Sequence, residues 1–170
     1  MKQLSLISLL LPLCFLLGFT PEDNLVPSKS LDDSGLVKDS EQIFLKHADA
    51  CLDMMEKEAK NIPMEGVAML AYIPGEATAA WTSKMRVVGK LADEKVNLLA
   101  IAYAKAGEMA VTQKDSGEQS RKEIGGELGD QGGAIIKIHS GYLVAAFSGG
   151  TSEDDLAVSK MGLDWLSKKF

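Results

Sequence analysis

The sequence predicts an α+β domain in which an antiparallel β-sheet is flanked by helices. Two pairs of apolar, β-prone runs are each separated by a short turn, at 74–77 and at 140–141, and this pattern indicates two β-hairpins. Three stretches with helical spacing of apolar residues, 39–61, 96–114 and 152–169, indicate helices. Hairpins and helices alternate along the chain, which favours a layered antiparallel domain over a doubly wound parallel sheet.

The first helix is expected over residues 39–61. Asp39 is the expected N-cap, because Gln42 follows three residues later in a capping-box arrangement. Pro63 follows the helix and prevents its continuation. The apolar residues that share one face of this helix predict the side that packs on the core: Phe44, Ala48, Cys51, Leu52, Met55 and Ala59.

The strands are expected at 66–73, 79–88, 134–138 and 142–147, with an alanine-rich helix over 96–114 between the two hairpins. After the fourth strand, a Ser-Gly-Gly turn reverses the chain. Thr151 or Ser152 is the expected N-cap of the last helix, because a hydroxyl there accepts a free backbone N–H. Three carboxylates follow in the first turn, where they interact favourably with the positive end of the helix dipole: Glu153, Asp154 and Asp155. Because they already occupy this positive end, they argue against an anion site there.

Residues 1–20 have the pattern of a secretory signal peptide: a basic start and an apolar stretch too short to favour a membrane span. Residues 21–38 are polar and contain two prolines, which predicts a flexible leader. We therefore expect a signal peptide, a leader and a single domain over 39–170, in a secreted or periplasmic protein without a membrane span after processing. Lipidation of Cys14 is an alternative; loss of the signal peptide leaves Cys51 as a lone cysteine.

Composition, net charge and motifs limit the classes of function that the sequence predicts. The chain has 170 residues, of which 46% are hydrophobic, which suits one globular domain. Its net charge of −6 argues against nucleic acid and anionic membrane surfaces as partners. No Ser/His/Asp pattern, CxxC, HExxH or phosphate-binding loop is present, so an enzyme is not the expected class. The weakest alternatives are a haem-degrading enzyme and one that uses Cys51 as nucleophile.

One group of neighbouring side chains contains the types that bind metal ions. His47, Cys51 and Met54 lie within two turns of the first helix, and imidazole, thiolate and thioether groups bind haem iron or copper. The alternative interpretation is a histidine at the edge of a core that contains ordinary Cys and Met side chains. On this evidence His47 is the candidate metal ligand.

Residues 144–158, Val-Ala-Ala-Phe-Ser-Gly-Gly-Thr-Ser-Glu-Asp-Asp-Leu-Ala-Val, resemble the closing signature of the GlcG/HbpS-like family. In that family a strand ends in Ser-Gly-Gly-Thr and a helix with an acidic start follows. The resemblance implies a profilin-like layered domain, frequent assembly into homo-oligomers, and binding of haem or a corrinoid by several members. It supports His47 as an axial ligand. The family turn Asp-Ala-Gly-Gly is replaced here by Ile-Pro-Gly-Glu at 73–76, which weakens any ligand role of that turn.

Two further candidates complete the expected site. Residues 102–106 resemble an Ala-x-x-Lys-Ala helix of the family, so Lys105 is a candidate binding residue, with a solvated lysine as the alternative. Gly132 and Gly133 end a glycine-rich loop that would let the backbone approach a flat ligand, with a mobile connection as the alternative. The expected function is an exported small-molecule-binding module for haem or a related tetrapyrrole. The alternative is a cofactor-free structural or interaction domain that acts through oligomerisation or a protein partner.

Overall fold

The computed structural model describes residues 31–118 and 121–170, with side chains from Gly35 onward. It confirms the α+β class, with three helices around a four-stranded antiparallel sheet in the described residues. The expected signal peptide and residues 21–30 of the expected leader lie outside the described residues. The elements are α1 (Leu31–Asn61), β1 (Gly66–Pro74), β2 (Thr82–Val88), α2 (Leu98–Thr112), β3 (Gly133–Ile138), β4 (Gly141–Ser148) and α3 (Ser152–Ser167).

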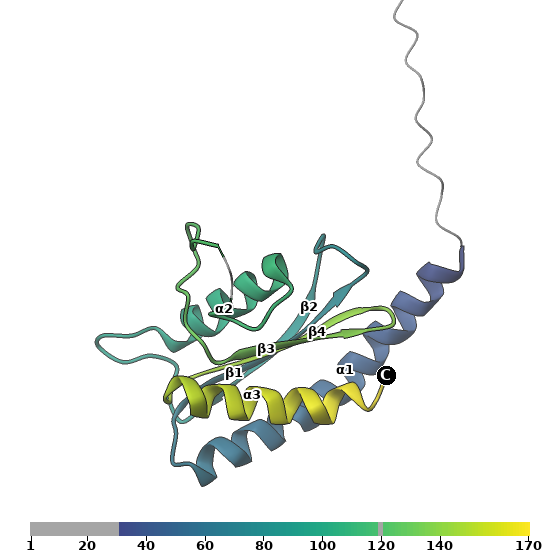
Figure 1. The fold of residues 1–170 in the computed structure, drawn as a ribbon. Coiled ribbons are helices and arrows are strands. Elements are labelled where there is room, and N and C mark those ends of the chain that lie inside the picture. Colours follow the sequence, from purple (N-terminus) through teal and green to yellow (C-terminus); the bar gives the residue numbers. More distant parts are fainter. Residues whose placement is uncertain (1–30, 119–120) are drawn as a thin grey trace, which may run out of the picture.

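The sheet has the strand order β2-β1-β4-β3. The two predicted hairpins, β1-β2 and β3-β4, meet through an antiparallel pairing of β1 with β4 at the centre. Helices α1 and α3 cover one face of the sheet and α2 covers the other (Figure 1). The two central strands are therefore buried on both faces, which explains their continuous apolar sequences.

Each face of the sheet has its own hydrophobic core. Alternate residues of β1 and β4 point to opposite faces, as strand geometry requires. The core under α1 and α3 includes Leu70, Tyr72 and Phe147, all almost fully buried. The core under α2 includes Met69 and Val144. The six residues predicted for the buried face of the first helix are all buried.

Helix α1 begins at Leu31, so the expected start and N-cap at Asp39 are wrong, and residues 31–38 are helical rather than a flexible leader. No proline lies in this segment to prevent a helix. Adding turns to an existing helix costs little compared with nucleating one. The added turns also pack: Val37 is half-buried and lines a small cavity with Tyr72 and Trp81.

The outer strand β2 is joined to α1 by charged side chains. Lys84 Nζ lies 2.7 Å from Asp49 Oδ2, and Arg86 pairs with both Asp53 and Glu56. These pairs are largely exposed, and such pairs each contribute about 0–1 kcal/mol. The apolar stripe of α1 therefore provides most of the attachment.

The structure confirms Thr151 as the N-cap of α3, with the Asp154 N–H donating to its hydroxyl at 3.2 Å. Asn97 caps α2 in the same way through the Ala100 N–H, so α2 starts two residues later than expected. Within the described ranges, no helix combines the length and the apolar character that crossing a bilayer requires.

Candidate functional site

The residues predicted for the site fall into two groups on opposite faces of the sheet. His47, Cys51 and Met54 belong to α1. Lys105 belongs to α2 and lies close to Gly132, which directly precedes β3. The sheet separates α1 from α2 (Figure 1), so the predicted residues do not form one common site.

On the α1 side, His47 packs against α3. Its ring is half-buried and lies edge-on to Trp165, with the two ring centroids 6.2 Å apart. Lys169 Nζ sits over the same indole, 4.4 Å from the ring centroid. Met54 is half-buried on the same helix. No group of three or more His, Cys, Asp and Glu side chains arranged for a metal ion occurs in the described part of the chain. A ligand role for His47 stays a prediction.

The Cys51 thiol faces the core. Its side chain is fully buried, and Sγ donates a hydrogen bond to the Gly162 carbonyl oxygen at 3.2 Å. Burial raises the pKa of the Cys51 thiol to about 12. Because the thiolate is the form that binds metals and attacks electrophiles, this environment favours a packing role.

We expect a thiol-reactive chromophore at pH 8 to label Cys51 only when the protein unfolds. With its pKa near 12, the thiolate fraction is about a thousandfold below that of an ordinary cysteine. The rate of absorbance change in buffer and in denaturant measures the effect, in a Cys14→Ala variant so that Cys51 is the thiol that reacts. Labelling in buffer at the rate of a free thiol would contradict the buried position and would restore the nucleophile alternative.

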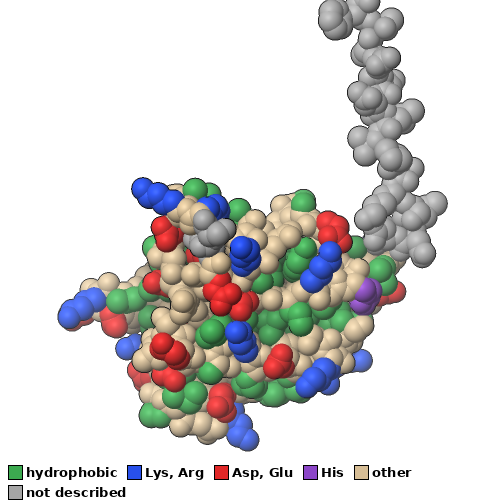
Figure 2. Space-filling model, viewed as in Figure 1, with side chains coloured by type: hydrophobic (Ala, Val, Ile, Leu, Met, Phe, Trp, Pro, Cys, Tyr) green, Lys and Arg blue, Asp and Glu red, His purple; other side chains and the backbone are tan. Residues whose placement is uncertain are grey.

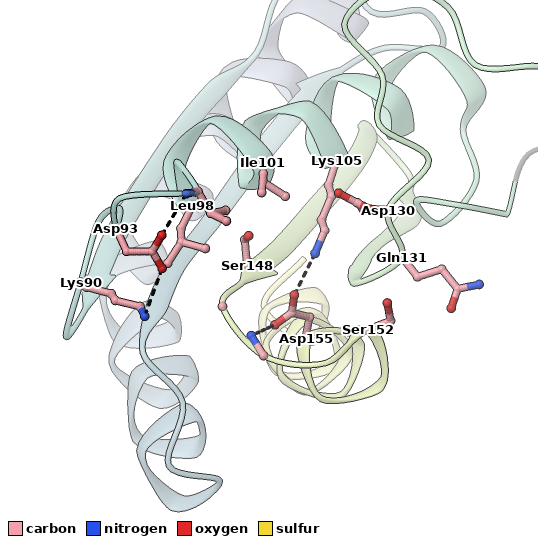
Figure 3. Close-up of a pocket in the computed structure, with 13 residues that line it drawn as sticks. Lys90, Asp93, Leu98, Ile101, Lys105, Asp130, Gln131, Ser148, Ser152 and Asp155 are labelled. Atoms are coloured by element: carbon pink, nitrogen blue, oxygen red, sulfur yellow. Dashed lines mark hydrogen bonds and ion pairs between the residues drawn. The ribbon is translucent and has the colours of Figure 1, made fainter.

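On the other face, Lys105 is the centre of a buried polar cluster. Its side chain is 4% exposed, so the alternative of a solvated lysine is wrong. Its Nζ donates to the carbonyl oxygen of Phe147 at 2.9 Å and to Asp155 Oδ2 at 2.8 Å. Figure 3 shows the side chain running from α2 toward the start of α3. Lys105 therefore ties α2 to the end of β4 and to α3.

Asp155 completes the cluster from the first turn of α3. Its Oδ1 accepts the Gly150 N–H at 2.8 Å while Oδ2 accepts from Lys105. Burial raises the pKa of Asp155, an effect that Lys105 and the N–H groups of Gly150 and Gly149 oppose. Sequence reasoning assigned this carboxylate to the helix dipole and missed it as a site residue. The available signal was a lysine in an alanine-rich, core-facing helix, which requires a buried partner.

Gly132 lets the chain pass close to this ion pair. A Cβ at Gly132 would lie 2.6 Å from Lys105 Nζ, and its φ of +121° also disfavours side chains. At Gly133 an added Cβ would meet Met109, and the Gly133 N–H donates to Ser116 Oγ at 2.8 Å. The close approach that these glycines permit is thus to side chains of the chain itself.

A pocket of about 340 Å³ opens above the ion pair, between α2, the loop 89–97 and the Gly149-Gly150 turn (Figure 3). We call it the Lys105 pocket. One wall is apolar and is formed by Val96, Leu98 and Ile101. The floor is polar and contains Lys105, Ser148 and Asp155. The remaining charged and amide side chains of the pocket come from the two neighbouring loops: Lys90, Asp93, Asp130 and Gln131.

Two polar groups at the floor retain hydrogen-bonding capacity. An ammonium has three N–H donors, and Lys105 uses two of them; within 31–118 and 121–170 the third has no acceptor. Ser148 is 3% exposed, and its hydroxyl makes no hydrogen bond to a described residue. Ser148 shares the α2-facing side of β4 with Val144 and Ala146, and Figure 3 shows its hydroxyl directed toward α2.

Comparison with protein-family models, curated proteins and solved structures finds no match to this chain. The resemblance to the GlcG/HbpS-like family therefore stays a prediction. The geometry of the Lys105 pocket nevertheless indicates which chemistry the pocket supports. An ammonium held by two oxygen acceptors supplies a fixed hydrogen-bond donor rather than a nucleophilic lone pair, so the pocket is suited to binding and orienting a molecule.

Proposed function

We propose that this chain is a small-molecule-binding domain and that its binding site is the Lys105 pocket. The observation that carries the proposal is a buried ammonium with an unused N–H at the floor of a cavity. Ligand sites are typically cavities of about 300–1,000 Å³ with an apolar lining and a few convergent polar groups. The Lys105 pocket, of about 340 Å³, has both an apolar wall and a polar floor.

The buried pair itself supports a functional role. Removing an ammonium and a carboxylate from water costs several kcal/mol per ion, and well-packed apolar side chains often stabilise a core equally well. Lys105 and Asp155 are 4% and 5% exposed at the side chain. Stability alone is thus a weak reason for this pair, whereas a binding pocket uses the fixed donor that the pair provides.

The lining of the Lys105 pocket does not favour haem. Its lining residues include no His, Cys, Met or Tyr that would bind haem iron. Its volume is also at the lower end of the range for ligand sites. The haem version of the proposal therefore depends on His47, on the other face of the sheet. We propose export of the protein on the basis of residues 1–20 alone.

A protein-observed NMR screen of the full chain tests the proposal. A library of small polar molecules is expected to shift the backbone amide signals of Gly149, Gly150 and Ser152, which border the pocket. Ile101→Trp, which fills the pocket from α2, should abolish the shifts. Val111→Trp, on the exposed side of the same helix, should preserve them, because Val111 is 64% exposed.

The same screen separates the alternatives. Haem that broadens signals around His47, with a sharp Soret band lost in His47→Ala, would support the haem version. The interaction domain has its own support: apolar side chains gather between α2 and α3 (Figure 2), where Ile135, Ile136 and Leu163 line a shallow cavity beside β3. No shift from any molecule, together with an assembly in sedimentation equilibrium, would contradict small-molecule binding and favour that alternative.

A further inference from the structure

We propose that the ligand of the Lys105 pocket is a small, uncharged, polyhydroxylated molecule of monosaccharide size. This inference rests on the proposed binding function and adds the chemical class of the ligand. Three properties of the pocket carry it: the balance of its charges, the mixture of free donors and acceptors, and the apolar wall that faces the polar floor.

The charges of the pocket nearly cancel in pairs. At the floor, Lys105 is neutralised by Asp155 at 2.8 Å. At the rim, Lys90 Nζ lies 3.6 Å from Asp93 Oδ2. Asp130 is the remaining charge among the lining residues, and it is exposed. An anion in the pocket would face this unbalanced carboxylate, and a cation would face the Lys105 ammonium, so a neutral ligand meets the least repulsion.

The polar groups of the pocket match hydroxyl chemistry. Lys105 offers one free N–H and accepts nothing, whereas the Ser148 hydroxyl both donates and accepts. The Asp130 carboxylate accepts only. A ligand hydroxyl can accept from Lys105 while a neighbouring hydroxyl on the same carbon chain donates to Ser148 or Asp130. Adjacent hydroxyl groups therefore satisfy donors and acceptors that a single carbonyl or amine leaves unmatched.

The walls of the pocket match the shape of a sugar ring. Leu98 and Ile101 form an apolar surface on the side of α2, and the polar atoms lie across from it at the end of β4 and the start of α3 (Figure 3). Val96, in the loop before α2, adds to the apolar lining. A pyranose ring has a C–H face that packs on aliphatic side chains and an edge of hydroxyl groups. A bound sugar ring therefore buries apolar area and also pairs the free hydrogen-bonding groups of the pocket floor.

Three probes with one carbon skeleton and one pyranose ring test the class: D-glucose, D-glucuronate and D-glucosamine, which are neutral, anionic and cationic at pH 6.5. Each is titrated into the full chain and followed by the amide signals of Gly149, Gly150 and Ser152. We expect saturable shifts with D-glucose and at least tenfold weaker binding of the two charged probes. Ser148→Ala should weaken glucose binding about fivefold without unfolding, because it removes one hydrogen bond. Ser167→Ala, at the far end of α3, should leave binding unchanged.

The outcomes separate the ligand class from the binding function. Tighter binding of glucuronate or glucosamine in the pocket would overturn the neutral class while leaving a small-molecule site in place. Equal glucose binding in Ser148→Ala would overturn the assigned floor contact. If none of the three probes shifts the pocket signals, the polyhydroxylated class is wrong; the wider screen with Ile101→Trp then decides separately whether the pocket binds any small molecule.

Discussion

Lys105→Met is expected to lower the free energy of unfolding by about 3–5 kcal/mol at pH 7. The substitution retains an apolar stem but removes the ammonium that neutralises Asp155 inside the protein. The carboxylate would stay buried with backbone N–H groups as its remaining partners, and the Phe147 carbonyl would lose its lysine donor. Urea denaturation of the variant and the wild type measures the difference.

The loss should depend on pH. Burial already raises the pKa of Asp155 while Lys105 opposes the rise, so removing Lys105 raises that pKa further. A carboxyl whose pKa is higher in the folded than in the unfolded state stabilises the fold fully below the unfolded value, about 3.9, and this contribution is lost as pH rises through the folded value. The deficit of Lys105→Met should therefore be smaller at pH 4 than at pH 7.

Two controls make this expectation specific. Lys105→Met/Asp155→Asn should recover about 1–3 kcal/mol, because it removes the buried charge while the amide oxygen still accepts from Gly150. Lys137→Met breaks a pair with Glu76 of the same 2.8 Å length at exposed positions, and should cost about 1 kcal/mol or less. A cost for Lys105→Met no greater than that for Lys137→Met would contradict the buried ion pair.

Gly66→Ala is expected to destabilise the protein by about 3 kcal/mol or more. A Cβ at Gly66 would be driven into the carbonyl oxygen of Ser148 on the neighbouring strand, which is backbone and cannot rotate away. Gly149 lies at the same close contact between the two chain segments, because a Cβ there would meet the carbonyl oxygen of Glu65. Strands β1 and β4 can approach only because both positions are glycine, and the approach places Ser148 at the pocket floor.

Gly107→Ala is the matched control in α2. A Cβ at Gly107 meets no atom within 4 Å, and alanine is the better helix former, so this variant should gain roughly 0.5–1 kcal/mol. Chemical denaturation of both glycine variants gives the comparison. Equal stability of Gly66→Ala and the wild type would contradict the close contact between β1 and β4.

Much of the fold could be predicted because local signals and the fold agree. Alternation of apolar runs and turns predicted both hairpins, and the hydroxyl at Thr151 predicted the start of α3. The start of α1 could not be predicted from capping residues, because the capping-box pattern at Asp39 lies inside the longer helix. Tertiary packing of Val37 supports the extension of α1 before Asp39. The order of the strands depends on the pairing of β1 with β4, which are far apart in sequence.

The site was predicted only in part. Lys105 and Gly132 were proposed from a resemblance and from glycine spacing, and the structure brings them together. Their partner Asp155 is fifty residues from Lys105, and such a contact leaves no local pattern. The sequence assigned Ser148 to a turn. Its position at the pocket floor depends instead on the face of β4 on which it lies. His47, the strongest candidate by ligand chemistry, packs on Trp165 across the sheet.

Intermolecular NOEs between a bound molecule and the methyl groups of the protein would test the binding site most directly. The measurement uses D-glucose and each molecule of the screen that shifts the pocket amides. Binding in the Lys105 pocket predicts NOEs to the methyl groups of Leu98 and Ile101, which form its apolar wall. NOEs confined to Ile136 and Leu163 beside β3, with none to Leu98 or Ile101, would contradict the assignment of the site.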